Sequence, residues 1–308
     1  MLGIDLGGTK TEAVLLADDG QVHWRERVAT PAGDYGASLA AITGLVQRAR
    51  AQAGSTSERV SIGIGTPGTV TADGRMKNCN SVVLNGQFLK RDLEAALGQP
   101  VAVSNDANCL ALSEATDGAG AGADVVFAAI LGTGTGAGIA VHGRVLTGPN
   151  GLAGEWGHNP LPWSDPATDP LIRCFCGLTG CVETLISGPA IARDHASRHG
   201  GTLTAVQIAA AAAAGNADAK ATLERHAHRL ARALAGVINL LDPDVIVLGG
   251  GLSLMSHLYE RVPALWGEWV VSGGVREPVR TKIAPARHGD ASGVRGAAWL
   301  GRTASASA

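Results

Sequence analysis

The sequence predicts an α/β protein of two related domains facing a central cleft, and three observations support this prediction. The chain has 308 residues, enough for two domains of ordinary size. Short apolar segments with strand character alternate with longer segments of helical period. The segments 6–14 and 131–139 are alike, because each runs from an apolar strand through a Gly/Thr turn into a second apolar strand. A chance similarity between two glycine-rich hairpins is the alternative.

Composition narrows the class of protein. The net charge is −2, from 25 basic and 27 acidic residues without a basic run, which argues against a nucleic-acid or anionic-membrane surface. Asp5 interrupts any signal-peptide core, and no apolar stretch approaches the ~20 residues that span a bilayer. We therefore expect a cytoplasmic protein. Gly is about twice as frequent as usual, at 43 residues, which indicates many close backbone approaches.

The first part of the chain predicts a domain that opens on a hairpin. Leu39, Ile42, Leu45 and Val46 fall on one face of a helix. Hydrophobic periodicity predicts strands at 2–6, 12–16, 21–27, 60–68 and 101–105, and helices at 37–53, 90–97 and 106–118. The small residues of 118–123 predict a hinge, so the N-terminal small domain is expected over 1–118.

The rest of the chain predicts a larger domain over 119–290 and a C-terminal helix over 291–308 that packs back toward the first domain and ends in a disordered tail. A strand–turn–strand unit covers 125–146, and 150–183 is rich in loops. The expected elements that follow are helices near 204–214, 218–241, 254–270 and 292–300, and strands at 244–251 and 281–286.

Three glycine turns are candidates for binding a ligand, and the first two are candidates for binding phosphate. In the first, backbone N–H groups form an anion nest, hydroxyls and a Lys add donors, and a carboxylate can hold Mg²⁺ through water; its residues are Asp5, Gly7, Gly8, Thr9, Lys10 and Thr11. The second contains Gly132, Thr133 and Gly134, and the third contains Gly249 and Gly250 at the end of a strand, where α/β sheets bind ligands. An ordinary tight hairpin and a helix-entry turn are the alternatives.

A histidine and three clustered cysteines predict a structural zinc site. His158, Cys174, Cys176 and Cys181 supply the closed tetrahedral set of a structural Zn²⁺, although three free thiols would also fit a reducing compartment. The odd count of five cysteines argues against a disulfide framework. If zinc fixes this segment, Glu155 and Glu183 are held where they can bind sugar hydroxyls; solvated surface acids are the alternative.

The stretch SNDANCLALSEA, residues 104–115, places polar side chains directly before a helix. Asn and Asp are preferred N-cap residues, so a helix cap is one interpretation. The other is that Asp106 is a general base, and the residues alone leave both open.

These motifs, taken together, resemble the ROK family of sugar kinases over residues 1 to about 299. DLGGTKT and GTGTGAG resemble its two phosphate loops, and GTPG, NDAN, GEWGH, CFCGLTGCVE and DVIVLGGG follow in the family's order. The resemblance implies an actin/hexokinase-like ATPase fold with ribonuclease H-like halves. It also implies ATP and Mg²⁺ as well as zinc, and a homodimer. The phrase GEWGHNPLPW looks closest to bacterial fructokinases of the manno(fructo)kinase type.

The resemblance also assigns roles. Asp106 matches the catalytic base, and the sugar-contacting positions are Gly68, Asn80, Asn105, Glu155, His158 and Glu183. Asp5, Gly8, Thr9, Lys10, Thr133 and Gly250 match nucleotide-side positions. The implied activity is a fructokinase that phosphorylates the 6-hydroxyl of D-fructose, with mannose as a further candidate substrate. The alternatives are a hexokinase for glucose, mannose or N-acetylglucosamine, or a sugar sensor without turnover. The interval between His158 and Cys174 is longer than in many members and has no assigned role.

Overall fold

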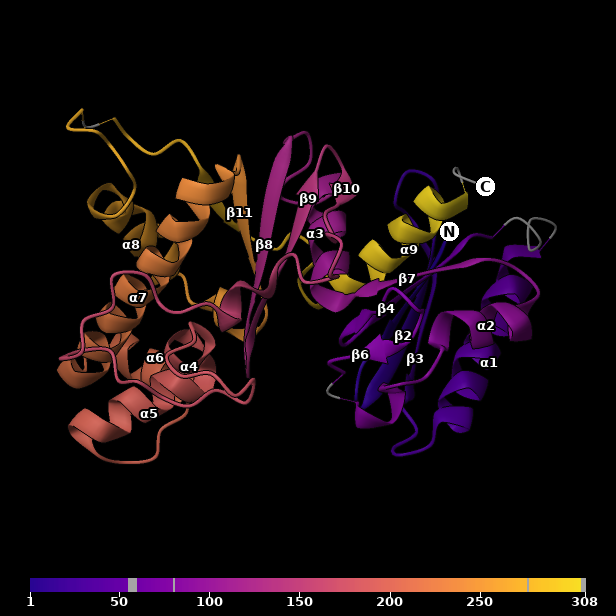
Figure 1. Cartoon of the computed structure of the whole chain (residues 1–308), viewed down its shortest axis with the longest axis horizontal. Helices are drawn as coiled ribbons and strands as arrows, with labels where there is room; N and C mark the ends of the chain where they lie inside the picture. Colours follow the sequence, from indigo (N-terminus) through magenta and orange to yellow (C-terminus); the bar gives the residue numbers. More distant parts are fainter. Residues whose placement is uncertain (55–59, 80, 276, 306–308) are drawn as a thin grey trace. The chain divides into compact units, whose positions relative to one another are not determined.

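The structure is a computed structural model that describes residues 1–54, 60–79, 81–275 and 277–305. The chain groups into two compact units (Figure 1). The first comprises Met1–Gly122, Gly138–Ala153 and Asp290–Ala308, and the second comprises Ala123–Ala137 and Gly154–Gly289. Residues 138–153, expected in the larger domain, thus group with the first unit. The predicted boundary at 118/119 stays a prediction.

The first unit is built on a five-stranded mixed sheet of order β3-β2-β1-β4-β7. The strands are β1 (Leu2–Leu6), β2 (Lys10–Leu16), β3 (Val22–Ala29), β4 (Ile62–Thr66) and β7 (Val101–Asn105), and a separate two-stranded sheet pairs β5 (Thr69–Val70) with β6 (Met76–Lys77). β1, β4 and β7 are parallel, with Asp5 opposite Gly65 and Thr66 opposite Asn105. Their carboxyl ends therefore bring Asp5 and Asn105 to one edge of the sheet.

Helices cover both faces of this sheet because its strands alternate. On β2, Ala13 and Leu15 join the core cluster of α1 (Tyr35–Ala53) and α2 (Leu89–Leu97), while Val14 and Leu16 join that of α3 (Asp106–Thr116) and α9 (Ser292–Ser305). A short 3₁₀ helix, η2 (Val82–Leu84), precedes α2. The helix α9 extends beyond the predicted 300; of the predicted disordered tail, residues 306–308 lie outside the described part.

Glycines form the seat on which α9 packs. A Cβ at Gly3 would lie 2.1 Å from the Val294 carbonyl oxygen, and one at Gly63 would lie 1.9 Å from that of Ala297. From the helix side, a Cβ at Gly296 would lie 1.7 Å from the Cys109 carbonyl oxygen. Backbones approach this closely only where a side chain is absent, so part of the high glycine content serves packing.

The second sheet has the order β10-β9-β8-β11-β12. Its strands are β8 (Val125–Leu131), β9 (Thr135–Val141), β10 (Arg144–Val145), β11 (Val245–Gly249) and β12 (Lys282–Pro285), and the division between the units falls inside β9. β8, β11 and β12 are parallel. The carboxyl ends of β8 and β11 therefore carry the second and third glycine turns.

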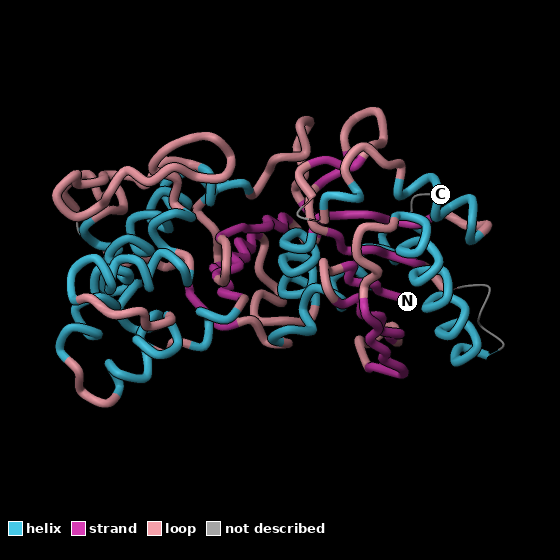
Figure 2. The backbone as a smooth tube through the Cα atoms, turned by 90° about the horizontal axis from the view of Figure 1, so that it is seen from below, coloured by secondary structure: helices cyan, strands magenta, loops and turns pink. Residues whose placement is uncertain are grey.

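Helices and loops also make up much of the second unit (Figure 2). Its helices are α4 (Glu183–Ile186), α5 (Gly188–His199), α6 (Ala205–Ala213), α7 (Ala217–Leu241) and α8 (His257–Leu265), with 3₁₀ turns η3 (Glu155–His158), η4 (Gly251–Leu254) and η5 (Trp266–Glu268). A further turn, η6 (Gly289–Ala291), precedes α9. The sequence missed α5, whose charged and histidine residues blur the apolar period. It also expected one helix over 254–270, where α8 ends at Leu265 and a 3₁₀ turn follows.

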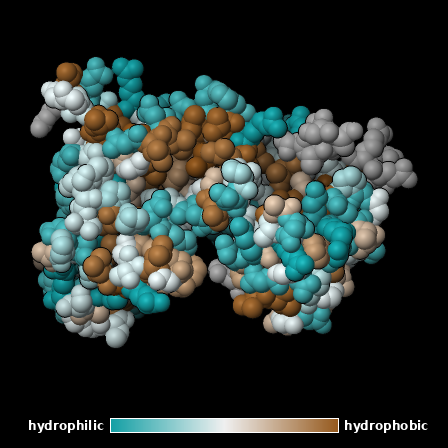
Figure 3. All heavy atoms as spheres, viewed as in Figure 1, coloured by the Kyte–Doolittle hydropathy of each residue, from teal (hydrophilic) through white to brown (hydrophobic). Residues whose placement is uncertain are grey.

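The surface mixes polar and apolar residues. Figure 3 shows hydrophobic patches among hydrophilic residues, and strongly exposed apolar side chains include Leu240, Leu254, Leu171 and Phe175. None of the helices in the described ranges is both long and apolar enough to cross a membrane.

Candidate functional site

The first glycine turn is held from inside by two threonine hydroxyls. The Gly7 N–H donates to the Lys10 carbonyl at 3.0 Å and closes the turn. Thr30 Oγ1 donates to the Gly7 carbonyl and lies 2.8 Å from Thr11 Oγ1, while the Thr30 N–H donates to the Thr9 carbonyl at 3.0 Å. Thr11 is fully buried, whereas Thr9 and Lys10 are exposed. The predicted phosphate loop thus presents its tip to solvent and uses Thr11 as an internal support.

Two acidic residues lie at the carboxyl ends of β1 and β7. Burial, followed by the negative charges of Asp106 and Glu12, raises the pKa of Asp5 to about 6, against an opposing effect of Arg27. The structure therefore places Asp5 and Asp106 close enough to interact electrostatically, and their repulsion would favour a cation between or beside them.

The surroundings of Asp5 fit a hydrated magnesium ion. A Cβ at Gly65 would lie 3.8 Å from Asp5 Oδ1, and one at Gly293 would lie 3.3 Å from Oδ2, so the residues that border the carboxylate on these two sides carry no side chain. Carboxylate oxygens are the protein ligands that Mg²⁺ prefers, and the ion usually keeps several waters. Asp5 is thus a chemically suitable outer ligand.

Asn105, rather than Asp106, caps α3. Asn105 Oδ1 accepts from the Ala107 N–H at 2.8 Å, and its Nδ2 donates to the Gly68 carbonyl at 3.1 Å. Asp106 Oδ1 also accepts from the Ala107 N–H at 2.8 Å and begins the helix. Both side chains are half-buried. Asn105 can therefore supply the cap without Asp106, so the two sequence interpretations are compatible, and the role of Asp106 as a general base stays a prediction.

The Gly68 loop is fixed by close backbone packing. Gly68 has φ +81°, and a Cβ there would lie 2.3 Å from the Lys77 carbonyl oxygen and 2.7 Å from Cys79 Sγ. The side chain of Asn85 accepts from the Cys79 N–H at 2.9 Å and donates to its carbonyl at 3.1 Å. Asn80, predicted to contact sugar, lies outside the described residues. Cys79, which precedes Asn80, contacts Gly68 and is bonded by the side chain of Asn85.

A cavity of about 220 Å³ adjoins the first glycine turn. Its wall includes Gly8 of the turn and the Ser81 hydroxyl, which is buried and has no partner among the described residues. The remaining wall is mainly apolar and includes Leu6, Pro31, Val83 and Leu84. No local pattern in the sequence indicates this cavity, because its residues are scattered over four segments.

The second unit brings the predicted metal ligands together. The ligand atoms of His158, Cys174, Cys176 and Cys181 all lie within 4.8 Å of one another. His158 Nδ1 is 3.5 Å from Cys174 Sγ, and the sulfurs of Cys176 and Cys181 are 3.6 Å apart. Zn–S bonds of about 2.3 Å in a tetrahedron give ligand separations of this size. The set, called the Cys/His cluster below, therefore fits a zinc ion.

Glycines shape the loop that carries the cysteines. Gly177 and Gly180 have φ of +92° and +79°, which side-chain-bearing residues rarely adopt. The Cys174 N–H donates to the Leu178 carbonyl at 2.8 Å, and the Gly180 N–H donates to the Ile172 carbonyl at 2.9 Å. These bonds fold residues 172–181, called the knuckle below, into a compact loop.

The two flanking acids differ in their surroundings. Glu155 has a side chain 45% exposed, with Oε2 3.9 Å from His158 Nε2, the ring nitrogen that is not beside Cys174. Glu183 is half-buried at the start of α4, where its Oε2 accepts from the Thr135 N–H at 2.8 Å. Glu155 is therefore available to a ligand, whereas Glu183 already binds the second glycine turn. The sequence did not indicate this second contact.

The third glycine turn borders a cavity of about 650 Å³. A Cβ at Gly250, where φ is +78°, would lie 2.5 Å from the Leu131 carbonyl oxygen, so the ends of β8 and β11 meet here. The cavity is lined by apolar side chains of α6, α7 and η4 and by a few charged ones: Val206, Ala209, Leu223, Leu254, Met255, Lys220, Glu224 and Arg261. The sequence indicated only the glycines that adjoin this cavity.

Comparisons with known proteins agree over the full length. The ROK family profile matches residues 1–304. N-acetyl-D-glucosamine kinases of Photobacterium profundum and Pectobacterium atrosepticum are 40% and 39% identical, covering 97% of this chain and 98% and 97% of those proteins. The ROK hexokinase of Thermus thermophilus superposes with TM-score 0.83 at 30% identity, covering 100% of this chain and 99% of that one. A ROK glucokinase of Streptomyces griseus, in complex with glucose and AMPPNP, gives 0.75 at 29%, covering 98% and 99%.

These relatives confirm the actin-like ATPase fold and correct the predicted activity. The fructokinase assignment is wrong, because relatives about 40% identical over the whole chain are N-acetyl-D-glucosamine kinases. The phrase GEWGHNPLPW, on which it depended, is a short stretch that does not distinguish hexoses. The predicted family resemblance is confirmed, since the family profile covers nearly the whole sequence. The chain belongs to the ROK family.

Proposed function

We propose that this protein transfers the γ-phosphoryl group of ATP to the 6-hydroxyl of N-acetyl-D-glucosamine. The observation that carries the proposal is the 40% identity to an N-acetyl-D-glucosamine kinase over 97% of the chain. Each unit supplies groups that are chemically suited to it: the first has a half-buried carboxylate and an exposed Gly/Thr/Lys turn, and the second has glycine turns at strand ends.

Asp106 serves as the general base in this proposal. Its carboxylate accepts the proton of the sugar hydroxyl as that oxygen bonds to the γ-phosphorus, and the bond to the leaving ADP oxygen breaks. Phosphoryl transfer relies mainly on positioning and charge neutralisation, so a base that is correctly held is sufficient. Asn105 supports this by bonding both the Gly68 loop and the first turn of α3. Gly68, Asn80, Glu155 and His158 remain the proposed sugar contacts.

The nucleotide is proposed to use the glycine turns. Gly8, Thr9 and Lys10 form the exposed tip of the first turn, and Thr133 is the exposed tip of the second. The apolar cavity of about 650 Å³ beside Gly250 and Gly251 is large enough for a purine base and ribose. Mg²⁺ would supply charge neutralisation at the phosphates, with Asp5 holding its water shell.

Zinc is proposed to have a structural role. A Cys₃His set leaves no open coordination position, so the ion would fix the fold of the knuckle and of His158 and would not polarise substrate. Burial and the neighbouring cysteine sulfurs raise the pKa of Cys181 to about 12. A bound dication would lower this pKa, because it stabilises the thiolate.

Turnover on a sugar panel tests the proposal. ADP release with Mg-ATP is expected to give the highest kcat/KM on N-acetyl-D-glucosamine, compared with glucose, mannose and fructose. Asp106→Asn is expected to lower kcat by about 10²–10⁴ while AMPPNP still binds. Asp73→Asn, at an exposed turn carboxylate, is the control and should retain normal turnover.

Each contrary outcome has a distinct meaning. A higher kcat/KM on glucose would keep the kinase and reject the substrate. Normal kcat in Asp106→Asn would reject the base. Absence of turnover on every sugar, in folded protein with bound zinc, would favour the sensor without turnover.

A further inference from the structure

We propose that Glu183 is a positioning residue that couples the Cys/His cluster to the second glycine turn, so that the metal state of the cluster sets the affinity for nucleotide. The inference rests on the proposed function for its ligand, ATP. It goes further by assigning Glu183 a task on the nucleotide side in addition to the predicted sugar contact.

The two oxygens of Glu183 face two different partners. Oε2 accepts the Thr135 N–H at 2.8 Å, and Oε1 lies 3.8 Å from Cys174 Sγ. A Cβ at Gly134 would lie only 2.7 Å from Oε2, so the turn must bring a glycine against this carboxylate. One side chain therefore connects a proposed metal ligand with the backbone of the turn.

Two more contacts seat the same turn on the same segment. A Cβ at Gly157, in the 3₁₀ turn that also carries His158, would lie 2.0 Å from the Thr135 carbonyl oxygen. The Gly188 N–H donates to the Gly132 carbonyl at 2.8 Å. The turn is thus bordered by residues before, within and after α4, and all of these belong to the second unit.

The helix that carries Glu183 depends on its neighbours for its position. α4 has only four residues, too few to be stable alone. The Thr184 hydroxyl donates to the Cys181 carbonyl at 2.7 Å, and the guanidinium of Arg193 donates to the Thr184 carbonyl. The placement of the carboxylate is therefore set by the knuckle on one side and by α5 on the other.

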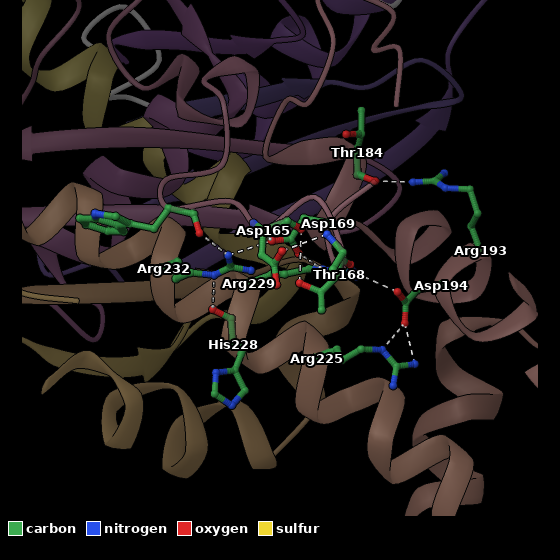
Figure 4. A network of polar contacts seen from close by, with 12 residues as sticks. Asp165, Thr168, Asp169, Thr184, Arg193, Asp194, Arg225, His228, Arg229 and Arg232 are labelled. Atoms are coloured by element: carbon green, nitrogen blue, oxygen red, sulfur yellow. Dashed lines mark hydrogen bonds and ion pairs between the residues drawn. The ribbon is translucent and has the colours of Figure 1, made fainter. Parts of the chain in front are cut away.

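The α5 side is rigidly anchored, which leaves the knuckle as the adjustable side. Figure 4 shows Asp194 between Arg225 and Arg229, with Nε of Arg225 2.8 Å and Nη2 of Arg229 3.0 Å from its oxygens. Arg229 also bonds Asp169 at 2.9 Å, and both side chains are at most 4% exposed. Buried, mutually bonded charges hold their geometry tightly, because breaking one pair strands the other charge.

The same network of Arg and Asp side chains also holds the long interval between His158 and Cys174 in place. Arg232 donates to the Trp163 carbonyl at 2.7 Å and pairs with Asp169 at 2.8 Å, and Asp169 accepts from the Asp165 N–H at 2.9 Å. The interval is therefore fastened to α7 and leads the chain to the knuckle from a fixed point.

A metal ion supplies what the knuckle otherwise lacks. Three sulfurs and one ring nitrogen within 4.8 Å of one another are drawn together by a dication and have no other common partner among the described residues. Without the ion, backbone hydrogen bonds still fold the knuckle, but no other group in the described part of the chain draws the sulfurs of Cys174 and Cys181 to a common centre, and Glu183 follows Cys181 closely in the chain. The Thr135 amide then loses a fixed acceptor, and the turn loses its preorganisation for phosphate.

Zinc removal from the full chain tests the coupling. We expect chelator-stripped protein to bind AMPPNP roughly tenfold more weakly by calorimetry without sugar, the size expected for one lost charge-assisted hydrogen bond. Amide exchange at Thr135 should become faster, while exchange in the first glycine turn stays unchanged. Readdition of zinc should restore both. Unchanged affinity and unchanged Thr135 protection after verified zinc loss would overturn the proposal.

Two variants at one position separate the roles of Glu183. Glu183→Gln retains an oxygen that can accept the Thr135 N–H, so most of the AMPPNP affinity should remain; Glu183→Ala should lose roughly tenfold. If Glu183 serves only the sugar, both variants raise the KM for sugar and leave the AMPPNP affinity unchanged, which would overturn the proposal. Should Glu183→Ala fail to fold, the zinc-removal measurement decides alone. Because AMPPNP binding is measured without sugar, failure of the substrate assignment leaves this result readable.

Discussion

The two related glycine turns are supported in different ways. The first is held by the neutral hydroxyls of Thr11 and Thr30, which belong to the same sheet and its connecting loop. The second is held by the carboxylate of Glu183, which comes from a segment almost fifty residues further along the chain and adjoins the Cys/His cluster. Two turns of similar sequence are thus supported differently, one by residues of its own sheet and the other by a residue of a distant segment.

This difference predicts that only one of the two turns depends on the metal. A hydroxyl pair buried in its own unit depends on little else, so the first turn should be indifferent to metal. The position of the Glu183 carboxylate depends on the fold of the knuckle, so the second turn should respond to zinc. Three further measurements test whether the two turns differ in this way.

The largest expected effect concerns Asp5, the acid beside the first turn. Burial and the neighbouring acids raise its pKa to about 6, above the unfolded value, so the folded protein binds this proton more tightly. That contribution to stability is present at low pH and is lost as pH rises through about 6. Asp5→Asn should therefore be more stable than the parent by up to about 3 kcal/mol at pH 8, with the difference vanishing near pH 4.

Urea unfolding of both proteins between pH 4 and pH 8 checks this sign. A difference that is constant across the range would mean that titration of Asp5 is not its source. Zinc removal should leave the difference unaltered, because the cause lies within the first unit.

The next effect compares glycines in the two turns. A Cβ at Gly134 would meet Glu183 Oε2 at 2.7 Å, whereas one at Gly8 would have Ser81 Oγ at 3.4 Å as its nearest contact. Gly134→Ala should lower the free energy of unfolding by about 2 kcal/mol, because the Glu183 carboxylate must move away and leave the Thr135 N–H without its acceptor. Gly8→Ala, the matched control, should stay within about 0.5 kcal/mol. Equal losses in chemical denaturation would show that the two turns are equally tolerant and would remove the contrast.

The smallest effect removes the support of the first turn. Thr30→Val keeps the shape but deletes the hydroxyl that bonds Gly7 and Thr11, and should cost about 1 kcal/mol of unfolding free energy. The loss should be the same with and without zinc. Thr43→Val is the control, because that hydroxyl bonds only the Leu39 carbonyl within its own helix. A zinc-dependent loss in Thr30→Val would contradict the independence of the first turn.

The sequence was sufficient wherever the information was local. The strands around both glycine turns, helix α7 and the cap before α3 follow from apolar period, Gly/Thr turns and Asn105. The four candidate metal ligands could be named from the sequence because three of them lie within eight residues. The structure places their donor atoms within 4.8 Å of one another.

What the sequence could not supply is contact between distant segments. Nothing near Thr30 marks it as the partner of Gly7, and nothing near Thr135 identifies Glu183 as its acceptor. Helix α5 was missed because Asp194 and its neighbours are polar for a tertiary reason, the ion pairs with α7. The predicted substrate was wrong for a related reason, since recognition of sugar hydroxyls depends on the positions of side chains that short motifs do not encode.

The glycine seat of α9 has a consequence for how the protein is made. Gly3 and Gly63 receive the backbone of α9, which is synthesised after the second unit, whereas β1 is synthesised before it. Until α9 has been synthesised, Val14, Leu16 and Leu112 of the first unit therefore lack the apolar partners that α9 supplies. During translation this apolar face of the first sheet is exposed to chaperones. The second unit can fold before the first is complete.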